Sequence, residues 1–177
     1  DLLRRMMAEG HEIGSHTFTH PNLGTSTSQR VRLELNATQR AIQSITGRST
    51  IYFRPPYYAD AEPRTMMEVR PVVQAVGYVT IGESIDPEDW KLQESTPDGQ
   101  SVPRTAELFA SEVIKGAEEG RGSIVLLHDA GGDRSETVKA LKLFVPELEK
   151  KGFHFVLVSK LMGKTTDDVM PKLTPAE

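Results

Sequence analysis

Two histidines in one short polar stretch have the clearest capacity for chemistry. His16 and His20 are four residues apart, so a helical turn or a tight loop can place both imidazoles on one side of the backbone. Imidazole nitrogens are common ligands of zinc and similar divalent metals. Residues 12–14 before them read as a strand end, where parallel α/β folds place their chemistry. The stretch predicts a metal-binding loop, with ordinary loop polarity as the alternative.

Two further polar groups follow predicted strands. Residues 54–57, Arg-Pro-Pro-Tyr, contain two prolines that would fix a turn and present the guanidinium of Arg54 to a carboxylate. Residues 86–90 place three acids beside the only tryptophan, Trp90. Such carboxylates can steer partners beside an aromatic wall. A structural turn in the first case and a capped surface turn in the second are the alternatives.

The fourth group is His128, which directly follows the most apolar strand predicted in the chain, residues 123–127. A continuous apolar run is typical of a buried parallel strand. A histidine at the end of such a strand is placed for acid or base work, and a purely structural histidine is the alternative.

The elements that must position these groups are strands alternating with amphipathic helices, a pattern that predicts a parallel sheet or barrel. Residues 91–102 are predicted to be a polar loop. In a parallel fold the four groups at the strand ends would face the same side. The predicted strands cover residues 12–14, 51–53, 78–82, 123–127 and 153–158.

Composition narrows the functional classes. The 177 residues, 37% of them hydrophobic and 26% charged, are typical of one soluble globular domain. The net charge of −4 argues against nucleic acid as a partner, and the absence of cysteine excludes disulfides and thiolate chemistry. No glycine-rich phosphate-binding motif supports nucleotide binding, and no apolar run reaches the length of a membrane span.

Taken in order, these groups resemble four of the five motifs of the polysaccharide deacetylase domain (NodB homology, carbohydrate esterase family 4). Residues 16–20 match its His-x-x-x-His motif, and residues 54–57 match Arg-x-Pro-Tyr. Residues 86–90 match Asp-x-x-Asp-Trp, and residues 126–128 match Leu-x-His. The resemblance covers about residues 1–160, which we expect to form the deacetylase domain, with residues 161–177 as a C-terminal extension.

The resemblance implies a distorted (β/α) barrel and a divalent metal, with zinc expected, held by His16, His20 and one aspartate. A second aspartate would be the general base, held in place by Arg54, and the backbone N–H of Tyr57 would bind the oxyanion.

It also implies that His128 protonates the leaving amine, paired with Asp86. Trp90 and Leu126 would form the wall of the acetyl pocket, and their pairing suits a small methyl group.

The family's first motif, Thr-Phe-Asp-Asp, is absent ahead of the histidine motif. We therefore expect a chain that lacks the first strand or strands of the barrel and is inactive by itself. The similar string at residues 165–168, Thr-Thr-Asp-Asp, raises the alternative of a permuted barrel, although no apolar strand precedes it.

The function implied is metal-dependent removal of acetyl groups from an N-acetylglucosamine-containing polysaccharide, such as chitin or a cell-wall glycan. The alternatives are O-deacetylation of xylan and a catalytically incomplete module that binds glycan. We expect an extracytoplasmic location and a polysaccharide partner. The run after His128 is also similar to deacetylase domains fused to a glycosyltransferase.

Overall fold

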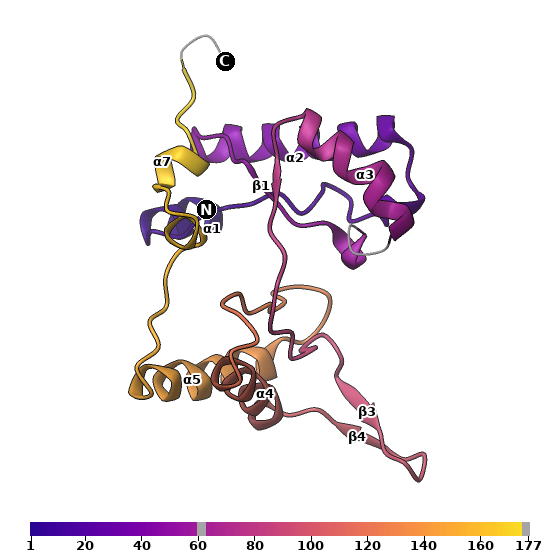
Figure 1. Cartoon of the computed structure of the whole chain (residues 1–177), viewed down its shortest axis with the longest axis vertical. Helices are drawn as coiled ribbons and strands as arrows, with labels where there is room; N and C mark the ends of the chain where they lie inside the picture. Colours follow the sequence, from indigo (N-terminus) through magenta and orange to yellow (C-terminus); the bar gives the residue numbers. More distant parts are fainter. Residues whose placement is uncertain (60–62, 175–177) are drawn as a thin grey trace. The chain divides into compact units, whose positions relative to one another are not determined.

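The computed structural model describes residues 1–59 and 63–174 (Figure 1). The chain forms two compact units, and the expected deacetylase domain of residues 1–160 stays a prediction. Unit 1 comprises Asp1–Ile81 and Val156–Glu177, and unit 2 comprises Gly82–Phe155. No helix in the described ranges combines the length and apolar character that crossing a membrane requires.

Unit 1 contains most of the helices, turns and strands of the described residues. They are α1 (Leu2–Ala8), the 3-10 turn η1 (Leu23–Thr25), α2 (Ser28–Thr46), β1 (Tyr52–Phe53), the 3-10 turn η2 (Pro56–Tyr58), α3 (Pro63–Ala75), β2 (Val79–Thr80), α6 (Val158–Leu161) and α7 (Thr166–Val169).

Parallel pairing joins three segments of unit 1, as the sequence predicts, but the regular strands are shorter than expected. β1 pairs with β2 in parallel, and Ser15 forms a parallel bridge to Phe53 on the other side of β1. The segment that contains Ser15 approaches β1 closely because Gly14 has no side chain. A Cβ at Gly14 would lie 3.2 Å from Cβ of Tyr52. Both the histidine loop and the Arg-Pro-Pro-Tyr turn leave this small sheet at the same end.

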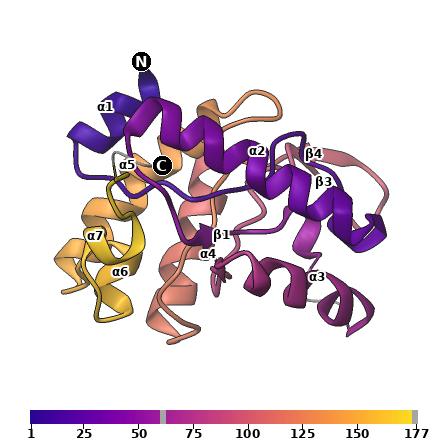
Figure 2. The same ribbon diagram turned by 90° about the horizontal axis from the view of Figure 1, so that it is seen from above.

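Helix α2 is amphipathic and packs its apolar stripe into the core of unit 1. The Thr27 side chain accepts a hydrogen bond from the Arg30 N–H at its start, and Gly47, with φ of 67°, ends it in a left-handed conformation. Val31 and Leu35 are buried among the side chains of α3 and β1. Figure 2 shows α1 beside α2.

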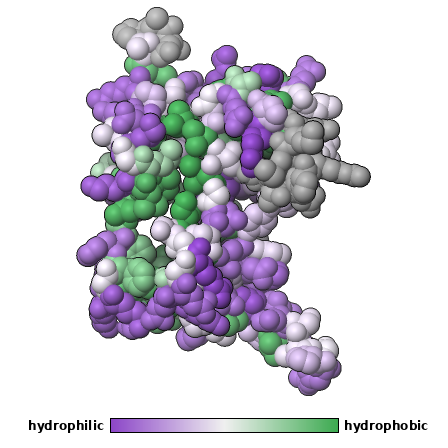
Figure 3. All heavy atoms as spheres, viewed as in Figure 1, coloured by the Kyte–Doolittle hydropathy of each residue, from purple (hydrophilic) through white to green (hydrophobic). Residues whose placement is uncertain are grey.

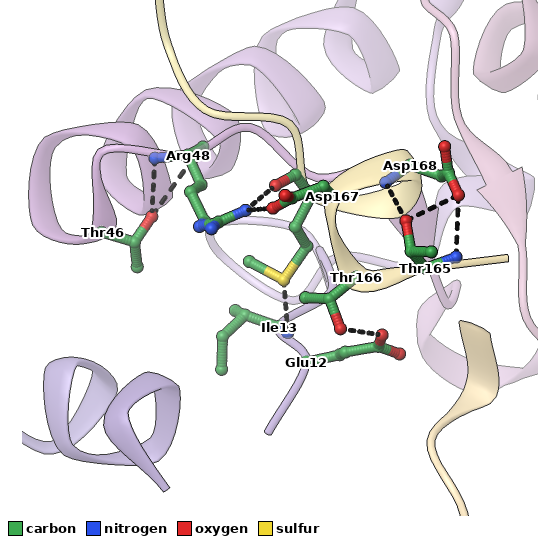
Figure 4. A network of polar contacts seen from close by, with 9 residues as sticks. Glu12, Ile13, Thr46, Arg48, Thr165, Thr166, Asp167 and Asp168 are labelled. Atoms are coloured by element: carbon green, nitrogen blue, oxygen red, sulfur yellow. Dashed lines mark hydrogen bonds and ion pairs between the residues drawn. The ribbon is translucent and has the colours of Figure 1, made fainter. Parts of the chain in front are cut away.

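Residues 165–168 form a helix start. The Thr165 side chain and the Asp168 carboxylate form a capping box at the first turn of α7 (Figure 4). Asp167 pairs with Arg48 at 2.5 Å. Both acids therefore have structural roles, which removes the support for a permuted barrel. Directly after them, Val169 and Met170 are completely buried, so part of the segment expected as an extension belongs to the core of unit 1.

Unit 2 is built on two helices, α4 (Ala106–Glu118) and α5 (Ser135–Lys150), which pack against each other (Figures 1 and 2). Ile85 forms a parallel bridge to Val125 and lies in the apolar core with Phe109 and Phe144. The strand predicted at residues 123–127 is therefore present only as this bridge.

The polar loop predicted at residues 91–102 is wrong in part. It contains an antiparallel hairpin of β3 (Gln93–Ser95) and β4 (Ser101–Pro103). Every residue of both strands is exposed, so no alternation of apolar and polar residues marks them in the sequence. Gly99, with φ of 80°, allows the tight turn between them.

The last predicted strand, residues 153–158, has no regular strand structure in the described part of the chain, and helix α6 begins at Val158. Without strand partners, its apolar side chains remain largely exposed. Figure 3 shows apolar residues gathered over α6 and the segment before it. In this part of unit 1 the exposed apolar residues are Val156, Leu157, Leu161 and Met162.

The burial of Met170 predicts a large effect of its truncation. Met170→Ala should lower the free energy of unfolding by about 2–5 kcal/mol, because it leaves a cavity and removes the sulfur that accepts the Ile13 N–H at 3.1 Å. Met162→Ala is the matched control, since Met162 is 37% exposed and should change stability by less than about 1 kcal/mol. Equal losses in urea unfolding of the two variants would contradict the packing described for α7.

Two buried tyrosines predict a loss of stability at high pH. Burial raises the pKa of Tyr78 to about 12, and burial with the nearby Glu12 charge raises the pKa of Tyr52 to about 12. The unfolded chain loses these protons near pH 10 whereas the folded chain keeps them. The free energy of unfolding should therefore fall as pH rises from about 10 to 12, by about 1.4 kcal/mol per pH unit for each tyrosine.

Urea unfolding over this pH range measures the slope, which should become shallower in Tyr78→Phe and in Tyr52→Phe. A slope that neither substitution changes would show that these hydroxyls do not cause it.

Candidate functional site

The histidine loop has a tight backbone. Thr17 and His20 both have left-handed conformations, with φ of 68° and 56°. The hydroxyl of Thr17 accepts a hydrogen bond from the His20 N–H at 3.1 Å, which closes the loop. The two rings consequently meet edge to face, with 4.9 Å between the centroids of His16 and His20. The loop thus brings together the two histidines that the sequence singles out.

The ring of His16 is oriented by a backbone carbonyl. Its Nδ1 lies 2.7 Å from the carbonyl oxygen of Arg54, which can only accept, so Nδ1 carries the proton and donates. The lone pair of the neutral ring is then on Nε2. In metal-binding histidines one ring nitrogen is commonly bonded to a carbonyl oxygen in this way, while the other binds the ion.

His20 contacts the Arg-Pro-Pro-Tyr turn. Its Nδ1 lies 3.2 Å from the hydroxyl of Tyr57, and the two rings meet edge to face at 4.9 Å. Tyr57 has a left-handed backbone, with φ of 58°, after the two prolines of the turn. The turn therefore positions both histidines, one through the carbonyl of Arg54 and one through the ring of Tyr57.

The donor set of this loop fits a divalent metal in part. Two neutral imidazoles from one short loop suit zinc and related metals. The described residues contain no group of three histidine, cysteine, aspartate or glutamate side chains that could hold an ion. The loop thus offers two of the ligands that a complete metal site requires.

Arg54 is partly buried, and its Nε donates to the carbonyl of Ile81 at 3.1 Å. This bond ties the guanidinium to the end of β2. The expected role of Arg54, holding a catalytic base, stays a prediction, as does oxyanion binding by the backbone of Tyr57.

In unit 2, His128 is fixed by a buried carboxylate. Asp89 is 1% exposed, and its two oxygens accept from the His128 backbone N–H at 3.0 Å and from Nδ1 at 2.7 Å. Because a carboxylate only accepts, Nδ1 carries a proton and Nε2 is the nitrogen that can exchange one with a substrate. Asp89 is therefore a carboxylate partner of His128 through Nδ1, and the expected pairing of His128 with Asp86 stays a prediction.

Asp86 shapes the loop through the backbone, since its carboxylate accepts from the Glu88 N–H at 2.7 Å. This contact turns the backbone so that Asp89 points inward, while Trp90 stays 49% exposed. Leu126 is buried and pairs its N–H with the carbonyl of Ile85 at 2.9 Å. The acetyl pocket expected between Trp90 and Leu126 stays a prediction.

Two residues that support Asp89 were not predicted from the sequence. The hydroxyl of Thr137 on α5 donates to the Asp89 carboxylate at 2.8 Å, and Arg134 donates to its backbone carbonyl at 2.9 Å. Thr137 lies on the buried face of α5, and a polar residue at such a position is the one sequence signal that could have identified it.

Comparisons with known proteins agree with these motifs. The model of the polysaccharide deacetylase family matches residues 1–81. A peptidoglycan-N-acetylglucosamine deacetylase from Bacillus cereus is 35% identical over 165 residues, which cover 91% of this chain and 68% of the relative.

Solved structures match the fold over nearly the whole chain. The chitin deacetylase of Colletotrichum lindemuthianum matches with a TM-score of 0.77 and 25% identity, over 97% of this chain and 71% of that structure. An acetyl xylan esterase from Clostridium thermocellum, solved with a cobalt ion, matches with a TM-score of 0.71 and 29% identity, over 93% and 72%. These matches confirm the expected fold class, the distorted (β/α) barrel. The chain therefore belongs to the polysaccharide deacetylase family.

Proposed function

We propose that the protein hydrolyses the acetamide groups of an N-acetylglucosamine-containing polysaccharide. The fixed orientation of His128 carries the proposal, because Asp89 holds its Nδ1 proton and leaves Nε2 for proton transfer. The matching orientation of His16 by the Arg54 carbonyl supports a metal site in unit 1. The peptidoglycan and chitin deacetylases among the similar proteins support the choice of substrate.

In this reaction the oxygen of water adds to the carbonyl carbon of the acetamide and the carbon–nitrogen bond breaks. The products are acetate and a sugar with a free amine. We assign His128 the transfer of a proton from Nε2 to the leaving nitrogen, with Asp89 stabilising the charged imidazole before that transfer.

His16 and His20 would hold the divalent metal through imidazole nitrogens, and zinc is the metal that we propose for them. Such a metal would supply polarisation of the acetamide carbonyl and activation of water. Arg54 and Tyr57 would also belong to the proposed site in unit 1. Arg54 would hold the catalytic base, and the backbone N–H of Tyr57 would donate to the oxyanion. In unit 2, Trp90 and Leu126 would contact the acetyl group, and Asp86 acts through the backbone of its loop.

The main alternative within the family is O-deacetylation of xylan, which the match to an acetyl xylan esterase supports. The two reactions differ in their products, because only N-deacetylation leaves a free amine on the sugar. The other alternative is a glycan-binding module without chemistry. We place the protein outside the cytoplasm, where such polysaccharides occur.

Removal of one metal ligand should abolish the activity. His16→Ala should weaken Zn²⁺ binding by more than about 100-fold, since even the outer partners of metal ligands contribute 10-fold to 100-fold. Acetate release by the full-length protein from N-acetylated chitooligosaccharides should stop. His11→Ala is the matched control, because His11 is an exposed histidine outside the histidine loop, with its ring 4.0 Å from the carboxylate of Glu9. Undiminished acetate release by His16→Ala would refute the assignment.

The charge of Asp89 should matter more than its size. Asp89→Asn keeps the shape but removes the anion that stabilises the imidazolium, so kcat/KM should fall about 10²-fold to 10⁴-fold. Thr137→Val keeps the carboxylate and removes one of its hydrogen bonds, so a fall of about 10-fold or less is expected.

Circular dichroism of each variant verifies folding before the kinetic comparison, and Asp98→Asn in the exposed hairpin turn is the control. Full activity in a folded Asp89→Asn protein would exclude His128 and Asp89 as the acid pair.

A further inference from the structure

The backbone between the two histidines is held in conformations that L-residues rarely adopt. Thr17 is β-branched and left-handed, with φ of 68°, and His20 follows with φ of 56°. Such conformations persist only where neighbouring groups hold them. The contact between Thr17 and the His20 N–H closes the loop from inside but leaves the N–H groups of the residues between them to find other acceptors.

Those acceptors come from one side chain on helix α2. The carboxylate of Glu34 accepts from the N–H of Phe18 and from the N–H of Thr19, both at 2.8 Å on Oε2. Its other oxygen, Oε1, accepts from the hydroxyl of Thr19 at 2.7 Å. Glu34 thus binds both residues between Thr17 and His20.

Glu34 is itself fixed in place. The glutamate is 3% exposed, and Arg30, one helical turn earlier, lies 2.6 Å from Oε1 and also donates to the Thr19 hydroxyl at 2.9 Å. Burial alone would raise the pKa of Glu34, but the hydrogen bonds from Thr19 and Phe18 and the charge of Arg30 lower it below its ordinary value. The carboxylate is therefore an anion that the loop's own N–H groups stabilise.

The packing of α2 fixes the position of the Glu34 carboxylate independently of the histidine loop. Val31 and Leu35, on either side of Glu34 in the helix, are 1% and 0% exposed in the core of unit 1. The helix cannot rotate without exposing them, so the position of Glu34 is set by the core. Through Glu34, the histidine loop is therefore attached to helix α2 and the core of unit 1.

We propose that Glu34 is a positioning residue that holds the loop between Thr17 and His20 in the conformation in which both histidines can bind a metal ion. The proposal rests on the proposed function, which requires that ion. Glu34 acts through the backbone and does not need to touch metal or substrate. A carboxylate that served only general stability would leave the metal affinity of the folded protein unchanged when it is replaced.

Glu34→Gln tests this role, because glutamine has nearly the same shape but lacks the charge, and its NH₂ group cannot accept from the loop N–H groups. In the 177-residue chain, Zn²⁺ affinity measured by titration calorimetry should fall about 10-fold to 100-fold, the range seen for outer partners of metal ligands. The titration is carried out at a temperature where circular dichroism shows each variant to be folded.

Glu12→Gln is the matched control. Glu12 is another glutamate of unit 1, partly buried, and it accepts from the Ser159 N–H and the Thr166 hydroxyl, both at 3.1 Å. Its replacement costs comparable hydrogen bonds away from the histidine loop, so Zn²⁺ affinity should stay within about 2-fold of the original chain. Equal affinity in Glu34→Gln and the original chain, or equal losses in both variants, would overturn the role of Glu34.

A measurement without metal separates this role from the proposed function. Amide hydrogen exchange of Phe18 and Thr19 in the metal-free chain should be slow and should accelerate at least about 10-fold in Glu34→Gln. Unchanged exchange would overturn the positioning role whatever the metal result. Accelerated exchange in a chain that binds no Zn²⁺ would instead support the loop contact and contradict the metal site of the proposed function.

Discussion

The pairing of Ser15 with β1 is the contact on which the candidate residues of unit 1 depend. Ser15 donates to the carbonyl of Tyr52 at 2.8 Å, and its own carbonyl accepts from the Arg54 N–H at 3.0 Å. These two bonds bring the start of the histidine loop beside the start of the Arg-Pro-Pro-Tyr turn. The next contact along, from His16 to the carbonyl of Arg54, then follows from the same register. A shift of this pairing register by one residue would turn the side chain of His16 to the other face of the sheet. The contact of His16 with the carbonyl of Arg54 would then be lost.

Both candidate loops use the same physical device, a buried carboxylate that accepts backbone N–H groups. Glu34 binds two N–H groups of the histidine loop, and Asp89 binds the N–H and the ring of His128. Hydrogen bonds to a charged acceptor are stronger than neutral ones, and a buried anion without its donors is costly. Each loop is therefore held by a buried carboxylate, Glu34 on helix α2 or Asp89 in its turn. The intrinsic backbone preferences of the loop residues do not hold it alone.

The sequence predicted which residues belong to the candidate site better than it predicted the contacts between their side chains. Motif spacing placed His16, His20 and His128 after strand segments, and the helical stripes of α2, α4 and α5 were visible as apolar periodicity. The contact of Asp89 with His128 was not visible, because Asp86 and Asp89 lie in one turn and only the fold decides which side chain points inward.

Contacts between distant residues escaped sequence reasoning for the same reason. Glu34 lies 15 residues from Thr19, and its one signal was a charged residue between the buried Val31 and Leu35. The burial of Met170 was hidden by its polar surroundings, although the capping box at Thr165 marks a helix start just before it. Such pairings depend on tertiary packing, which overrides local pattern.

We propose that this protein removes acetyl groups from amino sugars with the help of a metal. The most direct measurement is to quantify acetate and new free amine together, for the full-length protein acting on N-acetylated chitooligosaccharides with Zn²⁺ and after chelation. We expect equal amounts of both products and their loss on chelation. Acetate from acetylated xylan without any free amine from the chitooligosaccharides, or release that survives chelation, would contradict this proposal.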